Sequence, residues 1–121
     1  MGRGRRVLLR YRRSGYGRAV GAAGLWLAQL SNGRTSAGYS VAPGERGHGY
    51  AADALSALTD FAWTLPRPHR VELHIEPWNI GSIRTAQRSG HAREGLMRGH
   101  QEIGDRRRDM LLNAAGAAPL E

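Results

Sequence analysis

Apolar and polar residues alternate along parts of this chain with the two-residue period of a β-strand. The alternation is clearest from His69 to Glu76, where Val71, Leu73 and Ile75 are separated by charged or polar residues. Successive side chains of a strand point to opposite faces of a sheet, so this segment is predicted to be a strand with one buried face.

An apolar run from Val20 to Leu30 is also predicted to be a strand. It is followed by Ser31-Asn32-Gly33, and Asn-Gly favours the positive φ values of a tight hairpin turn. A second strand, expected from about Thr35 to Val41, then completes a hairpin.

Two further segments repeat apolar residues every three or four positions, which is the period of an amphipathic helix. The first runs from about Ala51 to Ala62 and is stopped by Pro66. In the second, Asn79 is placed as an N-cap, and Gly90 fits the left-handed position that follows a last helical turn.

The predicted order is strand, strand, helix, strand, helix and two final strands. The last two, residues 92–103 and 107–114, are expected to form a hairpin around Gly104-Asp105. Neither an internal repeat nor an interdomain linker interrupts this series, so residues 19–116 are predicted to be a single α/β (α+β) core. Residues 1–18 are an Arg-rich extension, either a short strand or disordered, and residues 117–121 are a C-terminal tail.

Charge is concentrated at the N-terminus. The formal net charge is +8, but seven of the 18 arginines lie in the first eighteen residues, and residues 19–121 carry 11 arginines against 10 acidic residues. The core is therefore nearly neutral, and nucleic acid is not favoured as a partner. Cysteine is absent, and the histidine spacing suggests no metal site. No segment resembles a signal peptide or a membrane span, so a cytoplasmic location is expected.

A glycine-containing loop, Arg46-Gly47-His48-Gly49-Tyr50-Ala51, connects the second strand to the first helix. Its glycines let the backbone turn tightly and approach a ligand closely. The helix that follows directs its unsatisfied N–H groups and the positive end of its dipole at the same place. The loop is therefore a candidate phosphate site, although glycine pairs also mark ordinary turns.

The segment from Gly38 to Ala51 resembles the acetyl-coenzyme A signature of the GNAT N-acetyltransferase superfamily, in which an Arg/Gln-x-x-Gly-x-Gly/Ala loop joins a strand to a helix. Arg46, Gly49 and Ala51 meet that pattern. Further motifs resemble the branch that contains ribosomal-protein N-terminal acetyltransferases: His69-Arg70-Val71-Glu72-Leu73, Asn79-Ile80-Gly81-Ser82-Ile83-Arg84, Arg93-Glu94-Gly95-Leu96 and Arg106-Arg107-Arg108-Asp109-Met110. Together the motifs cover about residues 20–114.

The resemblance implies a mixed, mostly antiparallel sheet with two flanking helices, in which the strand before the loop and the strand after the first helix splay apart. Main-chain groups near Val41 would bind the pantetheine arm of acetyl-coenzyme A, the co-substrate, in the slot between these strands. The implied pyrophosphate contacts are Arg46, Gly47, His48, Gly49, Tyr50 and Ala51, with Asn79 on the opposite wall. The opening strand and helix pair of the branch are not represented in this chain.

The reaction implied by the resemblance is acetyl transfer to an amine, with a protein N-terminus as one acceptor class. On this resemblance Ser82 would protonate the departing thiolate, and a carboxylate would take a proton from the amine. Many relatives carry Glu before the Gly-Tyr of the signature strand, where this chain has Ser36-Ala37. Glu102, on the last hairpin, is therefore the first carboxylate to test as the base.

Two other functions stay open. One is a shortened GNAT-like domain without turnover, because the acceptor-side wall is incompletely represented. The other is an Arg-rich module that associates with nucleic acid or the ribosome through residues 1–18. A homodimer that completes the acceptor side is compatible with the sequence, and no membrane partner is expected.

Overall fold

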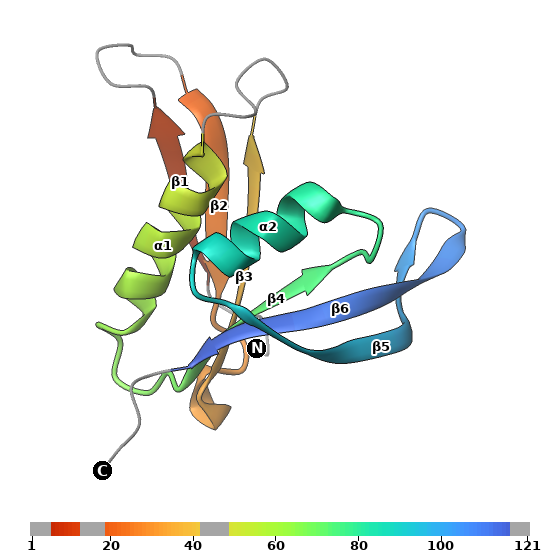
Figure 1. The fold of residues 1–121 in the computed structure, drawn as a ribbon. Helices are drawn as coiled ribbons and strands as arrows, with labels where there is room; N and C mark the ends of the chain where they lie inside the picture. Colours follow the sequence, from red (N-terminus) through yellow and green to blue (C-terminus); the bar gives the residue numbers. More distant parts are fainter. Residues whose placement is uncertain (1–5, 13–18, 42–48, 117–121) are drawn as a thin grey trace.

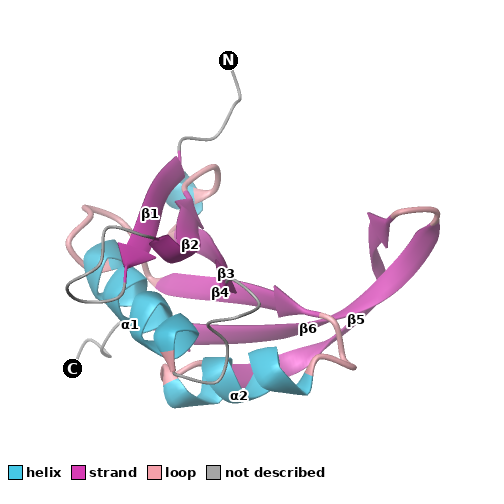
Figure 2. Cartoon of the chain, turned by 90° about the horizontal axis from the view of Figure 1, so that it is seen from above, coloured by secondary structure: helices cyan, strands magenta, loops and turns pink. Residues whose placement is uncertain are grey.

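The computed structural model describes residues 6–12, 19–41 and 49–116 of the 121-residue chain. In these ranges a twisted sheet of six strands carries two α-helices on one face (Figures 1 and 2). The strands are Arg6–Arg12 (β1), Ala19–Trp26 (β2), Arg34–Val41 (β3), Arg70–Ile75 (β4), Ala92–Ile103 (β5) and Arg106–Gly116 (β6). The α-helices are Tyr50–Ala62 (α1) and Ile80–Arg88 (α2).

The strands lie in the order β1-β2-β3-β4-β6-β5, and the central pair, β3 and β4, is parallel whereas the other described pairs are antiparallel. Helix α1 is the crossover that parallel neighbours require. The predicted mixed, mostly antiparallel sheet with two flanking helices is therefore confirmed.

The parallel pair separates soon after it forms. Its pairing is limited to Arg34 with Arg70, Thr35 with Val71 and Ser36 with Glu72. Beyond these residues β3 continues beside β2, while β4 turns away beside β6 (Figure 1). The splayed central pair that the resemblance implied is thus present, and it leaves a gap in the middle of the sheet.

The core lies between the helices and the sheet as two neighbouring clusters. One cluster includes Leu25, Leu58 and Val71, and the other includes Leu73 and Ile83. These side chains are at most 9% exposed, and burying each of them contributes roughly 1.5–3 kcal/mol. Residues of β4 alternate between buried and half-buried, which confirms the predicted strand with one buried face.

The connection between β2 and β3 differs from the predicted tight turn. The predicted strand Val20–Leu30 ends at Trp26, and a 3-10 helix, Leu30–Asn32, precedes Gly33. Gly33 has a φ of 76°, as the Asn-Gly signal indicated. The Gln29 side chain accepts a hydrogen bond of 2.9 Å from the Asn32 amide and closes a wider loop. The hairpin is confirmed, but its turn is longer than predicted.

Part of the Arg-rich N-terminal segment belongs to the sheet. Strand β1 pairs antiparallel with β2, from Arg6 opposite Trp26 to Arg12 opposite Ala19, and Val7 packs against the core. Over Arg6–Arg12, the short strand is thus present, which is one of the two states that the sequence left open. Residues 1–5, 13–18, 42–48 and 117–121 lie outside the described residues, and so does the predicted C-terminal tail.

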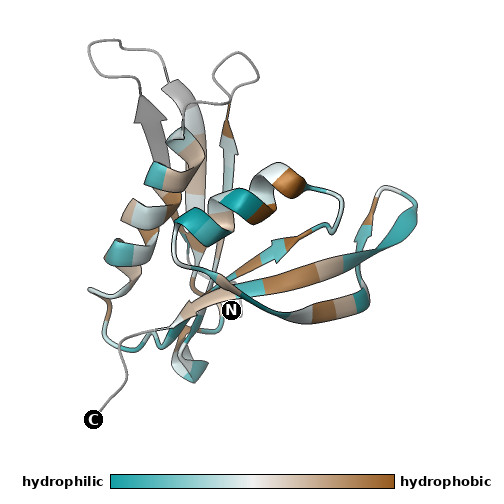
Figure 3. Cartoon of the chain, in the orientation of Figure 1, coloured by the Kyte–Doolittle hydropathy of each residue, from teal (hydrophilic) through white to brown (hydrophobic). Residues whose placement is uncertain are grey.

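Both predicted helices and the last hairpin are confirmed. Asn79 is the N-cap of α2, Gly90 follows the helix with a φ of 80°, and Gly104 lies in the turn between β5 and β6. This hairpin extends beyond the helices, and its far end is largely hydrophilic (Figure 3). In the described part of the chain, neither helix has the length and apolar character needed to cross a membrane.

Candidate functional site

A groove of about 860 Å³ lies between the end of β3, the start of α1 and helix α2. Six of the predicted site residues line this groove. They are Val41 at the end of β3, Gly49, Tyr50 and Ala51 at the start of α1, and Asn79 and Ser82 at the start of α2. Three separate sequence segments therefore meet in one place. The other predicted cofactor contacts, Arg46, Gly47 and His48, lie outside the described residues.

The N-terminus of α1 has a conformation that requires glycine. Gly49 is the N-cap with a φ of 78°, in the left-handed region, and its carbonyl accepts the Asp53 N–H at 3.1 Å. A Cβ at Gly49 would meet nothing within 4 Å, so the constraint is on the backbone and not on space. Because Gly49 has no side chain, it supplies no side-chain cap to the first turn of α1.

The start of α2 forms the opposite wall of the groove. The Asn79 side-chain oxygen accepts the backbone N–H of Ser82 at 3.1 Å, as expected for a capping residue. Asn79 and Ser82 line not only the groove but also a second, smaller cavity.

The second cavity, of about 210 Å³, lies where the central strands separate. Pairing of β3 and β4 ends at Ser36 and Glu72, and the cavity is lined by the residues that follow on both strands: Ala37, Gly38 and Tyr39 on one side, and Leu73, His74, Ile75 and Glu76 on the other. Tyr39, Asn79 and Ser82 line both spaces, so the groove continues into the gap in the sheet.

The gap connects the two faces of the sheet. Leu73 and Ile75 point to the helix side and are buried, whereas His74 and Glu76 alternate with them and belong to the opposite, open face. A ligand that enters along α1 and a second ligand on the open face could therefore meet within this small cavity.

Charged side chains at the two ends of β4 are each paired with neighbouring side chains. Glu76 accepts the Trp78 indole N–H at 2.8 Å and lies 3.8 Å from the Arg108 guanidinium. At the other end of β4, Arg70 pairs with Glu72 and Glu94. The hydrogen bond to Glu94 is the main reason that the pKa of Arg70 is raised, with burial acting against it.

Tyr39 lies where the groove meets the gap. The Tyr39 hydroxyl is buried and makes no hydrogen bond to any described residue, although Tyr39 lines both the groove and the second cavity. Such an orphaned group costs free energy unless a ligand or water satisfies it. Tyr39 and the start of α1 line the same groove, so a ligand in the groove would lie beside both.

Glu102 is placed elsewhere. It is exposed near the end of the β5–β6 hairpin, opposite Arg107, and it lines neither cavity. The structure therefore does not bring this predicted base together with Ser82. In its place the gap contains His74 and Glu76, which the sequence analysis did not select. The alternation along β4 had put both on the polar face, but no local signal indicated a gap beside them.

The sequence matches the acetyltransferase (GNAT) domain family over residues 2–92. The chain therefore belongs to the GNAT acetyltransferase family, and the resemblance drawn from its motifs is confirmed. It is 29% identical over 93 residues to an uncharacterized N-acetyltransferase, p20, of Bacillus licheniformis. That match covers 77% of this chain and 52% of the relative, so the chain spans about half the length of this relative.

Solved structures share the fold. Mycobacterium smegmatis RimJ in complex with CoA-disulfide has a TM-score of 0.75 and 31% identity, covering 84% of this chain and 49% of RimJ. A chimera of the spermidine N-acetyltransferase SpeG of Vibrio cholerae and hSSAT has a TM-score of 0.79 at 17% identity, covering 92% of this chain and 69% of the chimera. At 17% identity, the likeness to the SpeG chimera shows only that the two proteins share a fold.

Proposed function

We propose that this protein transfers the acetyl group of acetyl-coenzyme A to an amine. The observation that carries the proposal is the gap between β3 and β4, through which the groove at the start of α1 continues to the open face of the sheet. Family membership and the CoA-disulfide complex of the RimJ relative support the same reading.

Residues on both walls of the groove suit the parts of acetyl-coenzyme A. The start of α1 at Gly49, Tyr50 and Ala51 would bind the pyrophosphate, because helix N-termini favour anions through their N–H groups and dipole. The preceding loop residues, Arg46, Gly47 and His48, would complete that cradle. Main-chain groups near Val41 would bind the pantetheine arm as an added strand, opposite Asn79.

The chemistry is proposed for the cavity where the strands separate. Bound acetyl-coenzyme A would supply a thioester carbonyl that an amine can attack. Ser82, at the junction of the groove and the cavity, would give a proton to the departing sulfur. Asn79 would keep Ser82 in place by holding its backbone N–H. The small cavity would limit access of water to the reacting groups.

A protein N-terminal amine is the acceptor class that we propose. The motifs shared with the ribosomal-protein N-terminal acetyltransferases support it. On the open face, an extended peptide could lie across β3 and β4 and direct its terminal amine into the gap. A polyamine such as spermidine is the comparison acceptor, because it tests whether any accessible amine is sufficient.

Two measurements on the full chain test the proposal. Calorimetry with acetyl-coenzyme A is expected to show binding, and a thiol reagent is expected to report coenzyme A release that depends on an added peptide. The protein has no cysteine, so it adds no background to the thiol signal. Binding without release by any peptide or polyamine would indicate a domain without turnover. Absence of binding would overturn the proposed function.

A further inference from the structure

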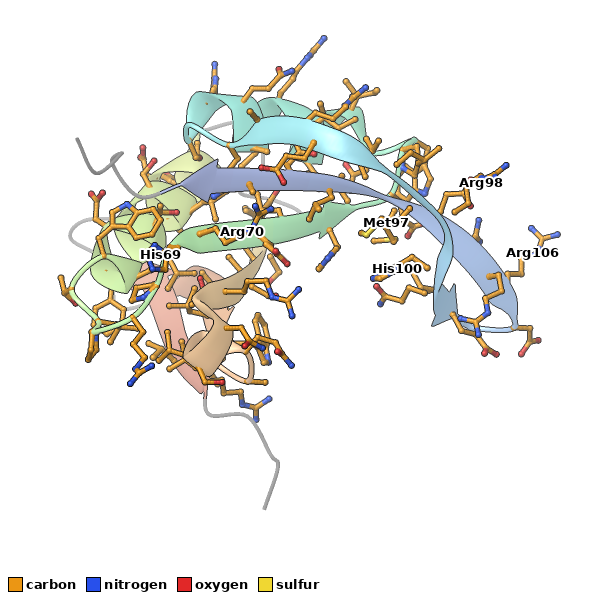
Figure 4. All side chains as sticks on the ribbon, turned by 90° about the horizontal axis from the view of Figure 1, so that it is seen from below. His69, Arg70, Met97, Arg98, His100 and Arg106 are labelled. Atoms are coloured by element: carbon orange, nitrogen blue, oxygen red, sulfur yellow. The ribbon has the colours of Figure 1, made fainter. Side chains whose placement is uncertain are left out.

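The open-face end of the gap contains a pair of histidines. His74, on β4, lines the second cavity together with Ser82. The ring of His100, on β5, stacks on it with centroids 5.3 Å apart and planes inclined by 26°. Figure 4 shows His100 and Met97 beside the bent β5–β6 hairpin, whereas Arg98 and Arg106 point away from it.

A bulge in β5 makes this contact possible. In the sheet β6 lies between β4 and β5, so His100 reaches His74 only because the hairpin bends over the open face. The register of β5 shifts between Met97 and Gln101, and Gly99 within this stretch has a φ of 55°. The Gly99 N–H donates to an Asp109 side-chain oxygen at 2.8 Å, which ties the bulge to β6.

The charged groups around His74 come from three strands. Glu72 on β4 and Glu76 just after β4 flank it in the sequence, His100 covers it from β5, and Arg108 reaches Glu76 from β6. Glu72 is bound by Arg70, and Glu76 by the Trp78 indole. Both carboxylates thus already accept hydrogen bonds from other side chains of the protein.

Two effects keep His74 uncharged at neutral pH. Burial lowers the pKa of His74, and the nearby His100 lowers it further, while Glu72 acts in the opposite direction. A neutral imidazole that faces a reaction space can accept a proton. Glu102, by contrast, lines no part of this space.

We propose that His74 is the general base of acetyl transfer and that His100 is the residue that positions and tunes it. This inference rests on the proposed function. Ser82, from the start of α2, and His74, from β4, line one cavity, so a proton donor and a proton acceptor both border the space where acceptor and thioester would meet.

The proton balance of the step is complete. An ammonium ion on the open face gives one proton to His74 and becomes a neutral amine. Its nitrogen forms a bond to the thioester carbonyl carbon, and the carbon–sulfur bond breaks. The second proton of the nitrogen goes to the departing sulfur by way of Ser82. His74 then releases its proton to solvent, so each turnover yields an amide, a thiol and one proton.

A titration of the free protein, without any turnover, tests whether His100 lowers the pKa of His74. NMR of the histidine rings, assigned with His74→Gln, is expected to give His74 a pKa below the usual 6.5. His100→Phe keeps a ring over His74 but removes its charge, so the pKa of His74 should rise. A normal pKa in the unmodified chain, or one unchanged by His100→Phe, would overturn the role of His100.

The pH dependence of turnover tests the base itself. His74→Gln should lower kcat by about 100-fold and remove the ascending low-pH limb of kcat/KM, with acetyl-coenzyme A affinity unchanged. His69→Gln, an exposed histidine that lines neither cavity, is the matched control and should leave both quantities unchanged.

The outcomes separate this inference from the proposed function. If the unmodified chain releases no thiol, the proposed function and the base both fail. If it turns over and His74→Gln retains the rate and the low-pH limb, only the base assignment fails. If Glu76→Gln removes that limb while His74→Gln does not, the base is Glu76 and the inference is wrong.

Discussion

At the scale of single residues, Gly49 is required for its backbone conformation. Its φ of 78° costs an L-residue about 1–2 kcal/mol, because Cβ approaches the following carbonyl oxygen. We therefore expect Gly49→Ala to lower the unfolding free energy by about that amount and to weaken acetyl-coenzyme A binding as the start of α1 shifts. Denaturant unfolding and calorimetry measure the two effects.

Gly95→Ala is the control for Gly49. A Cβ at Gly95 also meets open space, but its φ is not in the left-handed region, so only a small change in stability is expected. If Gly49→Ala and Gly95→Ala lowered the unfolding free energy equally, backbone strain at Gly49 would not be the cause of the loss.

Ser82 belongs to the same scale, because its proposed role resides in one hydroxyl. Ser82→Ala should lower kcat by up to about 100-fold while leaving acetyl-coenzyme A affinity nearly unchanged, since the Asn79 bond uses the backbone N–H that alanine keeps. Ser56→Ala, on α1 and outside both cavities, is the matched control. Full activity of Ser82→Ala would remove the hydroxyl from the mechanism.

At the scale of elements, the β5–β6 hairpin holds His100 against His74. Asp109→Ala removes the acceptor of the Gly99 N–H and should release the bulge. Amide exchange at Gly99 is then expected to become faster, and the pKa of His74 to rise as its ring becomes more exposed. Asp105→Ala, in the exposed turn of the same hairpin, should change neither. An unaltered exchange rate at Gly99 would contradict this account of the bend.

The elements also show where sequence reasoning was sufficient. The alternation in β4, the Asn79 cap and the Gly104 turn depend on neighbours in the chain, and each was predictable. The resemblance placed Val41, Asn79 and Ser82 around a splayed strand pair, and the groove brings them together. The wider β2–β3 loop was missed because it depends on how the Gln29 side chain folds back.

Glu102 and His74 mark the limit of that reasoning. Glu102, on the last hairpin, was the carboxylate chosen to be tested first as the base. The bend of that hairpin determines which of its residues reaches the gap, and it brings His100 there. That bend arises from a bulge and an Asp109 contact ten residues away, which no local periodicity reveals. The catalytic roles of Ser82 and of any base stay predictions for the kinetic tests.

At the scale of the whole molecule, one buried histidine links stability to pH. His91, just after α2, is 2% exposed, and its Nε2 has no hydrogen-bond partner among the described residues. Burial lowers the pKa of His91, and the hydrogen bond to the Ser89 carbonyl acts in the other direction. The unfolded chain therefore binds a proton more readily than the folded chain.

The sign of the effect follows from that difference in proton binding. Because the pKa of His91 is lower in the folded state, stability is complete above the usual pKa of 6.5 and falls as pH decreases below it. His74 adds to this dependence in the same direction.

We expect the unfolding free energy, measured with urea, to decrease between pH 7 and pH 5. His91→Phe should flatten the decrease, because it keeps an apolar ring in the site and removes the titrating group. His69→Gln, at an exposed position, should preserve it. An equally steep decrease in His91→Phe would assign the acid sensitivity to other groups.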